Sequence, residues 1–207
     1  MSKVQEIQQL VKIVDTAYQP VHSRPSTLNL YGETLTYRYN LSSDLYSHYE
    51  SGNIVVLGIH GVNSLKLASA AVGQFLLPIV NNKEINKLCK KLEMLKKDKR
   101  NIYLVAHSLG CWYVASCMNA TFPTIMFAPY VPNAYSSKST RIAKERKFIK
   151  IFYEEDIVPG HLASMKGLTN AIILSNKNPI FNVKTIGGHK TDAFTGNIES
   201  NIVKTIN

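Results

Sequence analysis

The stretch that decides the fold is Leu104-Val105-Ala106-His107-Ser108-Leu109-Gly110-Cys111-Trp112. It joins an apolar run directly to a helical pattern over 110–119, so it predicts a strand, a tight turn and a helix in succession. The residues two before and two after the serine must be small, because larger side chains would collide in such a turn. Ala106 and Gly110 meet this requirement. Ser108 is therefore predicted to project from a strained turn, beside the backbone N–H groups that begin a helix.

Strands and helices alternate on both sides of this turn. Continuous apolar, β-branched runs, typical of buried central strands, lie at 53–59, 101–106, 124–127 and 148–152. Helical patterns lie at 3–17, 64–80, 83–97 and 110–119. A hairpin of edge strands is predicted over 27–31 and 34–39, a polar, turn-rich segment over 42–52, later strands at 171–174 and 182–186, and a last helix at 198–206. The alternation predicts an α/β protein with a mostly parallel central sheet covered by helices on both faces.

Composition agrees with one globular domain over 1–207. Of the 207 residues 45% are hydrophobic and 18% charged, which argues against disorder. No apolar run reaches the roughly 18–20 residues that span a bilayer, and the first residues do not have the order of a secretory signal. A cytoplasmic protein is therefore expected. Three cysteines without C-x-x-C spacing (Cys89, Cys111 and Cys117) predict buried free thiols and argue against a disulfide or a zinc site.

The net charge of +10 is concentrated in two segments, 83–100 and 138–150. Such basic patches attract anionic surfaces, so peripheral contact with an anionic membrane is one interpretation and a solvated helix face is the other. No aromatic residues interleave with the lysines, and no nucleic-acid-binding motif is present. Specific nucleic-acid binding is therefore not expected.

The candidate general base lies late in the chain. A serine hydroxyl becomes a good nucleophile only when a histidine accepts its proton and a carboxylate orients that histidine. On a strand-to-helix turn of this kind, the acid and then the histidine follow the serine along the chain. The two histidines after Ser108 are His161 and His189. His189 follows a strand-like run through two glycines, so we predict it as the base, with His161 shaping the pocket or a surface turn.

The candidate acid is Asp156, in the loop just beyond the predicted strand at 148–152. Glu154 and Glu155 are the alternatives. They rank below Asp156 because they lie nearer the strand. Asp192 is too close to His189 in sequence for the usual arrangement. The predicted triad is Ser108, Asp156 and His189.

Acyl transfer also needs two N–H donors for the oxyanion. One is the amide of Leu109, directly after the serine. The loop that follows the strand at 53–59 is expected to supply the other, from the amide of Val62, because Gly61 lets the backbone approach the substrate closely. The loop residues His60, Gly61 and Asn63 are predicted to contact the substrate.

These features together resemble the class 3 lipases, the fungal-lipase-like branch of the α/β-hydrolases. The residues that carry the resemblance are Ala106 to Gly110, Asp156 with Val158 and Pro159, and His189. The resemblance implies the α/β-hydrolase fold, a Ser-Asp-His mechanism with an acyl-enzyme intermediate, and a lipid carboxylic ester as substrate. The family usually carries Arg-Gly-Ser/Thr at the oxyanion loop, whereas this chain has His60-Gly61-Val62.

Two classes of function follow from the sequence. The first is a serine ester hydrolase of the lipase type, which requires no metal and no organic cofactor. The second is a catalytically inactive structural or interaction protein that keeps the fold. The very apolar segment 64–80 is either a lid over the site or a helix packed on the sheet.

Overall fold

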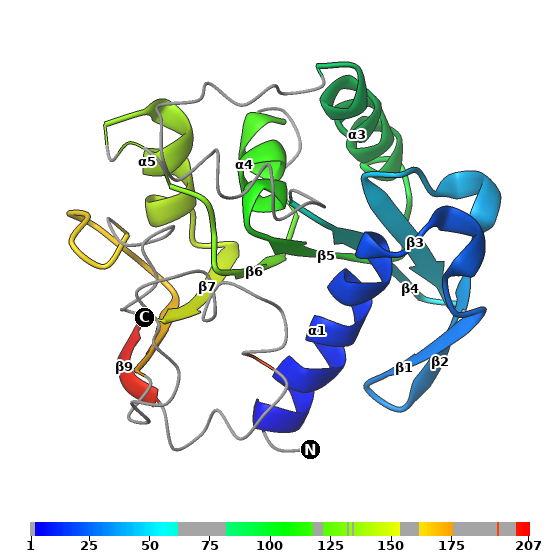
Figure 1. Cartoon of the computed structure of the whole chain (residues 1–207), viewed down its shortest axis with the longest axis horizontal. Helices are drawn as coiled ribbons and strands as arrows, with labels where there is room; N and C mark the ends of the chain where they lie inside the picture. Colours follow the sequence, from blue (N-terminus) through cyan, green and yellow to red (C-terminus); the bar gives the residue numbers. More distant parts are fainter. Residues whose placement is uncertain are drawn as a thin grey trace.

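The computed structural model describes residues 3–61, 82–117, 122–131, 133, 135–153, 162–175, 194 and 202–207. Within these residues, nine strands form one sheet whose spatial order follows the chain (Figure 1). The strands are β1 (Thr27–Leu30), β2 (Glu33–Tyr37), β3 (Tyr46–Glu50), β4 (Ile54–Ile59), β5 (Asn101–His107), β6 (Thr124–Phe127), β7 (Phe148–Tyr153), β8 (Ala171–Leu174) and β9 (Ile202–Ile206). The α-helices are α1 (Lys3–Tyr18), α3 (Asn82–Leu95), α4 (Leu109–Ser116) and α5 (Ser137–Lys144), and two short 3-10 helices are η1 (Val21–Ser23) and η2 (Tyr39–Leu41).

The sheet is mixed, which corrects the expectation of a mostly parallel sheet. Strands β4 to β8 run parallel, whereas β1 to β4 and the pair β8–β9 are antiparallel. Parallel neighbours need a long crossover, and antiparallel neighbours need only a short turn. The short connections near the N-terminus therefore form hairpins at one side of the parallel core.

Helices cover both faces of the sheet, as the sequence predicts (Figure 1). Alternate residues of β4 divide between the two layers: Val55 and Leu57 pack in the core that includes α3 and α4, and Val56 packs in the core under α1. Gly58 allows α1 to approach closely, because a Cβ there would collide with the backbone carbonyl of Ile13. None of the described helices is long and apolar enough to cross a bilayer.

Two predicted elements are wrong in type. The segment 42–52, predicted as polar and turn-rich, contains β3, which is buried because its polar residues find partners: the Ser47 hydroxyl is hydrogen-bonded to Thr16 (3.2 Å). The predicted last helix at 198–206 contains β9, paired antiparallel with β8. Its β-branched residues favour a strand when an edge is open for pairing. The predicted helix 64–80 and strand 182–186 lie outside the described residues.

The expectation of three free thiols is also wrong. Cys89 on α3 and Cys117 just after α4 form a disulfide across 28 residues, and Cys111 remains a buried free thiol. The sequence spacing carried no sign of this pair because α3 and α4 become neighbours only in the folded sheet. Disulfides persist in oxidising surroundings, so the Cys89–Cys117 bond does not support the expectation of a reducing compartment.

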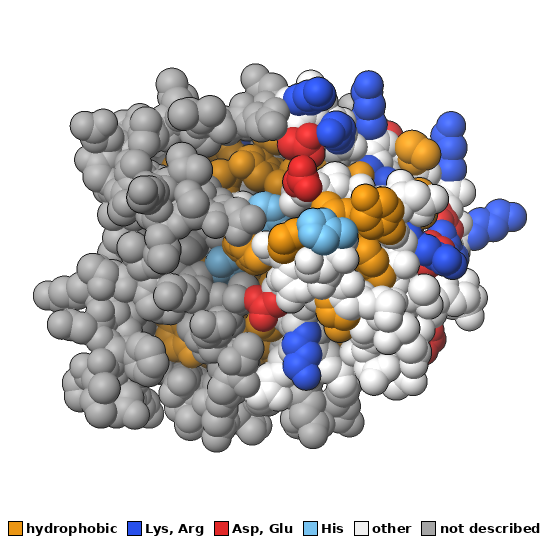
Figure 2. Space-filling model, turned by 45° about the vertical axis from the view of Figure 1, so that its right-hand side comes forward, with side chains coloured by type: hydrophobic (Ala, Val, Ile, Leu, Met, Phe, Trp, Pro, Cys, Tyr) orange, Lys and Arg blue, Asp and Glu red, His pale blue; other side chains and the backbone are white. Residues whose placement is uncertain are grey.

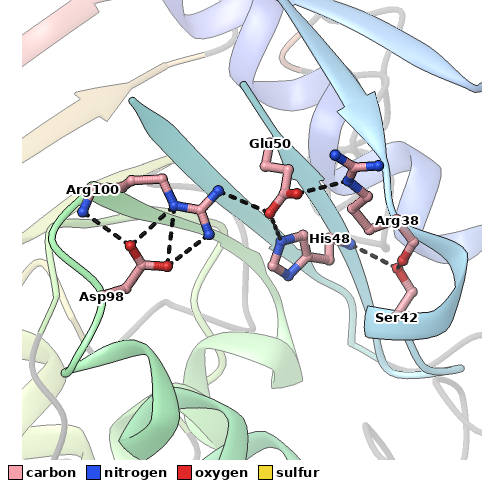
Figure 3. Close-up of polar contacts among 6 residues, drawn as sticks. All are labelled: Arg38, Ser42, His48, Glu50, Asp98 and Arg100. Carbon is pink, nitrogen blue, oxygen red and sulfur yellow. Dashed lines mark hydrogen bonds and ion pairs between the residues drawn. The ribbon is translucent and has the colours of Figure 1, made fainter. Parts of the chain in front are cut away.

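A charged network ties β3 to the loop that precedes β5 (Figure 3). Glu50 accepts hydrogen bonds from Arg38 (2.7 Å), from His48 Nε2 (3.0 Å) and from Arg100 (3.0 Å). Arg100 also pairs with Asp98 at 2.7 Å. Burial acts to raise the pKa of Glu50, but the three hydrogen bonds outweigh it and hold that pKa at about 2. The network lies at the end of the sheet opposite Ser108, so it stabilises the fold rather than the site.

His48 makes stability depend on pH. Its side chain is 1% exposed, and burial, followed by the nearby charge of Lys91, lowers its pKa from 6.5 to about 4. Between these two values the unfolded chain binds the proton that the folded chain excludes, so the unfolding free energy falls as the pH drops from 6.5 towards 4. The shift corresponds to about 3 kcal/mol at most. Urea unfolding at pH 7, 5.5 and 4 measures it.

The matched variants are His48→Gln, which keeps an N–H near Glu50 but does not titrate, and His22→Gln at an exposed position. We expect the unfolding free energy of His48→Gln to fall less between pH 6.5 and 4 than that of the wild type. His22→Gln should show the wild-type dependence of the unfolding free energy on pH. An unchanged profile in His48→Gln would assign the acid sensitivity to other groups.

Candidate active site

Ser108 occupies a strained backbone conformation between β5 and α4. β5 ends at His107, α4 begins at Leu109, and Ser108 has φ 55° and ψ −125°. A non-glycine residue in this region costs of order 1–3 kcal/mol and persists only where its surroundings hold it. Three backbone hydrogen bonds do so: Ser108 N donates to the Phe127 carbonyl (3.0 Å), and Cys111 N and Tyr130 N each donate to the Ser108 carbonyl (3.1 Å). Strain maintained in this way is typical of functional positions.

The small residues around Ser108 are required by close packing. Ala106 is fully buried. A Cβ at Gly110 would lie 2.6 Å from the carbonyl oxygen of Ile59 and 2.8 Å from that of His60. Glycine at 110 therefore allows the first turn of α4 to begin against the end of β4. The turn chemistry predicts the glycine, and the fold adds a second reason, the contact with β4.

Gly61 brings the backbone after β4 against the serine turn. A Cβ at this position would lie 2.8 Å from the Cβ of Ser108 and 2.9 Å from the backbone N of Leu109. Glycine at 61 therefore lets the backbone after β4 pack directly against the Leu109 amide. An N–H at the start of a helix is a suitable donor to a developing oxyanion.

His60 directs its polar atoms toward the backbone. Its Nδ1 lies 2.6 Å from the Gly61 carbonyl oxygen and its Nε2 lies 2.6 Å from the Asp44 carbonyl oxygen. Burial lowers the pKa of His60, and the two carbonyls act in the opposite direction. The ring therefore supports the loop after β4, and its contact with the substrate stays a prediction.

Tyr18, the last residue of α1, is the site neighbour that sequence reasoning did not assign. Its hydroxyl accepts a hydrogen bond from Gly61 N (3.1 Å) and is hydrogen-bonded to His107 Nδ1 (2.5 Å). The tyrosine and His60 rings also lie together, with centroids 4.8 Å apart. In the sequence, Tyr18 directly follows the helical pattern predicted over 3–17.

The structure thus brings Ser108, Leu109, His60 and Gly61 together. Several predicted residues lie outside the described residues: Val62, Asn63, Asp156 and His189, with the alternatives Glu154, Glu155 and His161. In the described parts of the chain, no group of three or more His, Cys, Asp or Glu residues is placed to hold a metal ion.

Two buried aromatic residues, Tyr153 and Phe194, lie at the sheet edge where β5, β6 and β7 end. Tyr153 ends β7, shortly before Asp156 in the sequence. Phe194 is fully buried, with ring centroids 5.1 Å from Phe127 and 5.6 Å from Tyr153. His189 precedes Phe194 by five residues in sequence, and a chain of that length spans at most about 17 Å.

Comparison with known proteins gives distant similarity in structure alone. No protein-family model matches the sequence, and no curated protein matches it. Among solved structures, the chain is similar to a mutant form of MDLA from Penicillium cyclopium, with 16% identity, a TM-score of 0.49, and coverage of 98% of this chain and 92% of that one. It is also similar to a fungal lipase, with 15% identity, a TM-score of 0.41 and the same coverage, 98% and 92%.

Proposed function

We propose that the protein is a serine hydrolase of the α/β-hydrolase fold that cleaves carboxylic esters. The observation that carries this proposal is the φ of 55° at Ser108, held by three hydrogen bonds at a strand-to-helix turn. The Leu109 amide supports it, because this N–H begins α4 directly after Ser108 and a tetrahedral intermediate needs an N–H donor beside the nucleophile.

In the proposed mechanism, the Ser108 hydroxyl attacks the ester carbonyl. His189 takes the hydroxyl proton and later gives it to the leaving alcohol, while Asp156 orients His189. The amides of Leu109 and Val62 stabilise the oxyanion. Water then hydrolyses the acyl-enzyme by the same proton path. Tyr153 and Phe194 support this arrangement, because both lie at the sheet edge that carries Ser108, three residues before Asp156 and five residues after His189 in the sequence.

We propose lipid esters as the substrate class, with peripheral contact to an anionic membrane. The resemblance to class 3 lipases and the apolar segment 64–80 support the first part. Basic side chains support the second: Lys83, Lys87 and Lys90 are exposed on α3, and Met94 beside them is 69% exposed. Figure 2 shows Lys and Arg side chains along the upper rim of the visible face, over α3.

The test is a fluorophosphonate probe, which reacts with activated serines. We expect the wild-type protein to be labelled, with peptide mapping locating the label on Ser108 and Ser23→Ala labelled like wild type. Turnover of esters with short, medium and long acyl chains then defines the substrate class. No labelling and no turnover would overturn the proposal and leave a non-catalytic protein of the same architecture.

A further inference from the structure

The backbone of Gly61 is held on both sides by side chains. Its N–H donates to the Tyr18 hydroxyl (3.1 Å), and its carbonyl oxygen lies 2.6 Å from His60 Nδ1. A backbone group in a loop ordinarily exchanges water partners freely, whereas here both polar atoms of one residue are directed by buried or half-buried rings. The position of Gly61 relative to the Leu109 amide is therefore set before any substrate arrives.

The Tyr18 hydroxyl joins this loop to the serine turn. Burial raises the pKa of Tyr18, so the hydroxyl keeps its proton. It accepts from the Gly61 N–H and is 2.5 Å from Nδ1 of His107, the residue directly before Ser108. One oxygen thus connects the two backbone segments that pack against each other at Gly61 and Leu109.

The end of α1 is itself fixed, which makes Tyr18 a firm support. Arg24 is buried and donates hydrogen bonds to the carbonyls of Ala17 (3.0 Å), Ser43 (2.9 Å) and Tyr46 (2.8 Å). These bonds attach the last turn of α1 to the segment entering β3. The Asp44 carbonyl oxygen in that segment lies 2.6 Å from His60 Nε2.

We propose that Tyr18 is a positioning residue of the ester hydrolase: its hydroxyl sets how the Gly61 backbone packs against the Leu109 amide, and so where this proposed oxyanion donor lies. This inference rests on the proposed function. Tyr18 does not touch the reacting atoms in the proposed mechanism. Its loss should therefore lower kcat through misplacement of the donor, with little change in KM.

The test compares Tyr18→Phe with Tyr49→Phe, whose buried hydroxyl donates instead to the Pro25 carbonyl (2.9 Å) away from the site. Two readouts are measured: kcat and KM for a soluble ester together with the rate of fluorophosphonate labelling, and hydrogen exchange of the Gly61 amide by NMR. We expect Tyr18→Phe to lose about 10- to 100-fold in kcat and in labelling rate at unchanged KM. Its Gly61 amide should exchange about 10-fold faster or more. Tyr49→Phe should change neither readout.

Wild-type kcat and labelling in Tyr18→Phe would overturn the inference while leaving Ser108 as the nucleophile, and so would a change confined to KM. An unlabelled wild type would overturn the proposed function and the role of Tyr18 with it; faster Gly61 exchange in the variant would then still identify the hydrogen bond. If Tyr18→Phe does not fold, His107→Leu removes the other partner of the same hydroxyl, and wild-type kcat in that variant overturns the inference.

Discussion

Replacing Ser108 by glycine should abolish covalent chemistry and stabilise the protein. Ser108 has φ 55°, where a side chain is strained at a cost of about 1–3 kcal/mol and glycine is not. Glycine also loses about 0.5–1 kcal/mol more backbone entropy on folding. The expected net gain is about 1 kcal/mol in the free energy of unfolding, measured by urea denaturation. Ester turnover should fall by about 10⁴-fold or more.

Ser108→Ala is the matched control for this experiment. It removes the same hydroxyl and so the same activity, but it keeps a Cβ and therefore the backbone strain. We expect its stability to stay within about 0.5 kcal/mol of wild type. If Ser108→Gly were no more stable than Ser108→Ala, the backbone at Ser108 would not be strained. The φ of 55° would then no longer support the proposed hydrolase function.

Gly61→Ala should have the second-largest effect. The new Cβ would lie 2.8 Å from the Ser108 Cβ and 2.9 Å from the Leu109 backbone N, so it must push the two segments apart and displace the Leu109 amide. Loss of one oxyanion donor typically costs about 10²–10³ in kcat, and we expect a loss of that size. Steady-state kinetics on a soluble ester measure it.

Gly52→Ala provides the control, because a Cβ at Gly52 meets no atom within 4 Å. It should keep wild-type kcat and KM. Full activity in Gly61→Ala would show that the reaction does not depend on the close contact of Gly61 with Leu109, and would remove Gly61 from the proposed site.

The elements nearest the serine turn were predictable because their patterns are local. The residues 101–106 and 110–119 carry a buried strand and a helical period, and the structure has β5 and α4 there. β3 was not predictable in this way, because a strand containing Ser47 and His48 reads as a polar turn until α1 and Glu50 supply partners for those side chains.

By itself the sequence determined where the chain turns most sharply and which residues there must be small, since that requirement depends on the few residues of the turn. Only the tertiary structure decided which distant groups meet the turn: Gly61 against Leu109, Tyr18 between Gly61 and His107, and Cys89 bonded to Cys117. The physical reason is that a hydrogen bond or a disulfide depends on a distance of a few ångströms. For residues far apart in the chain, that distance is set by the register and stacking of the sheet and its helices.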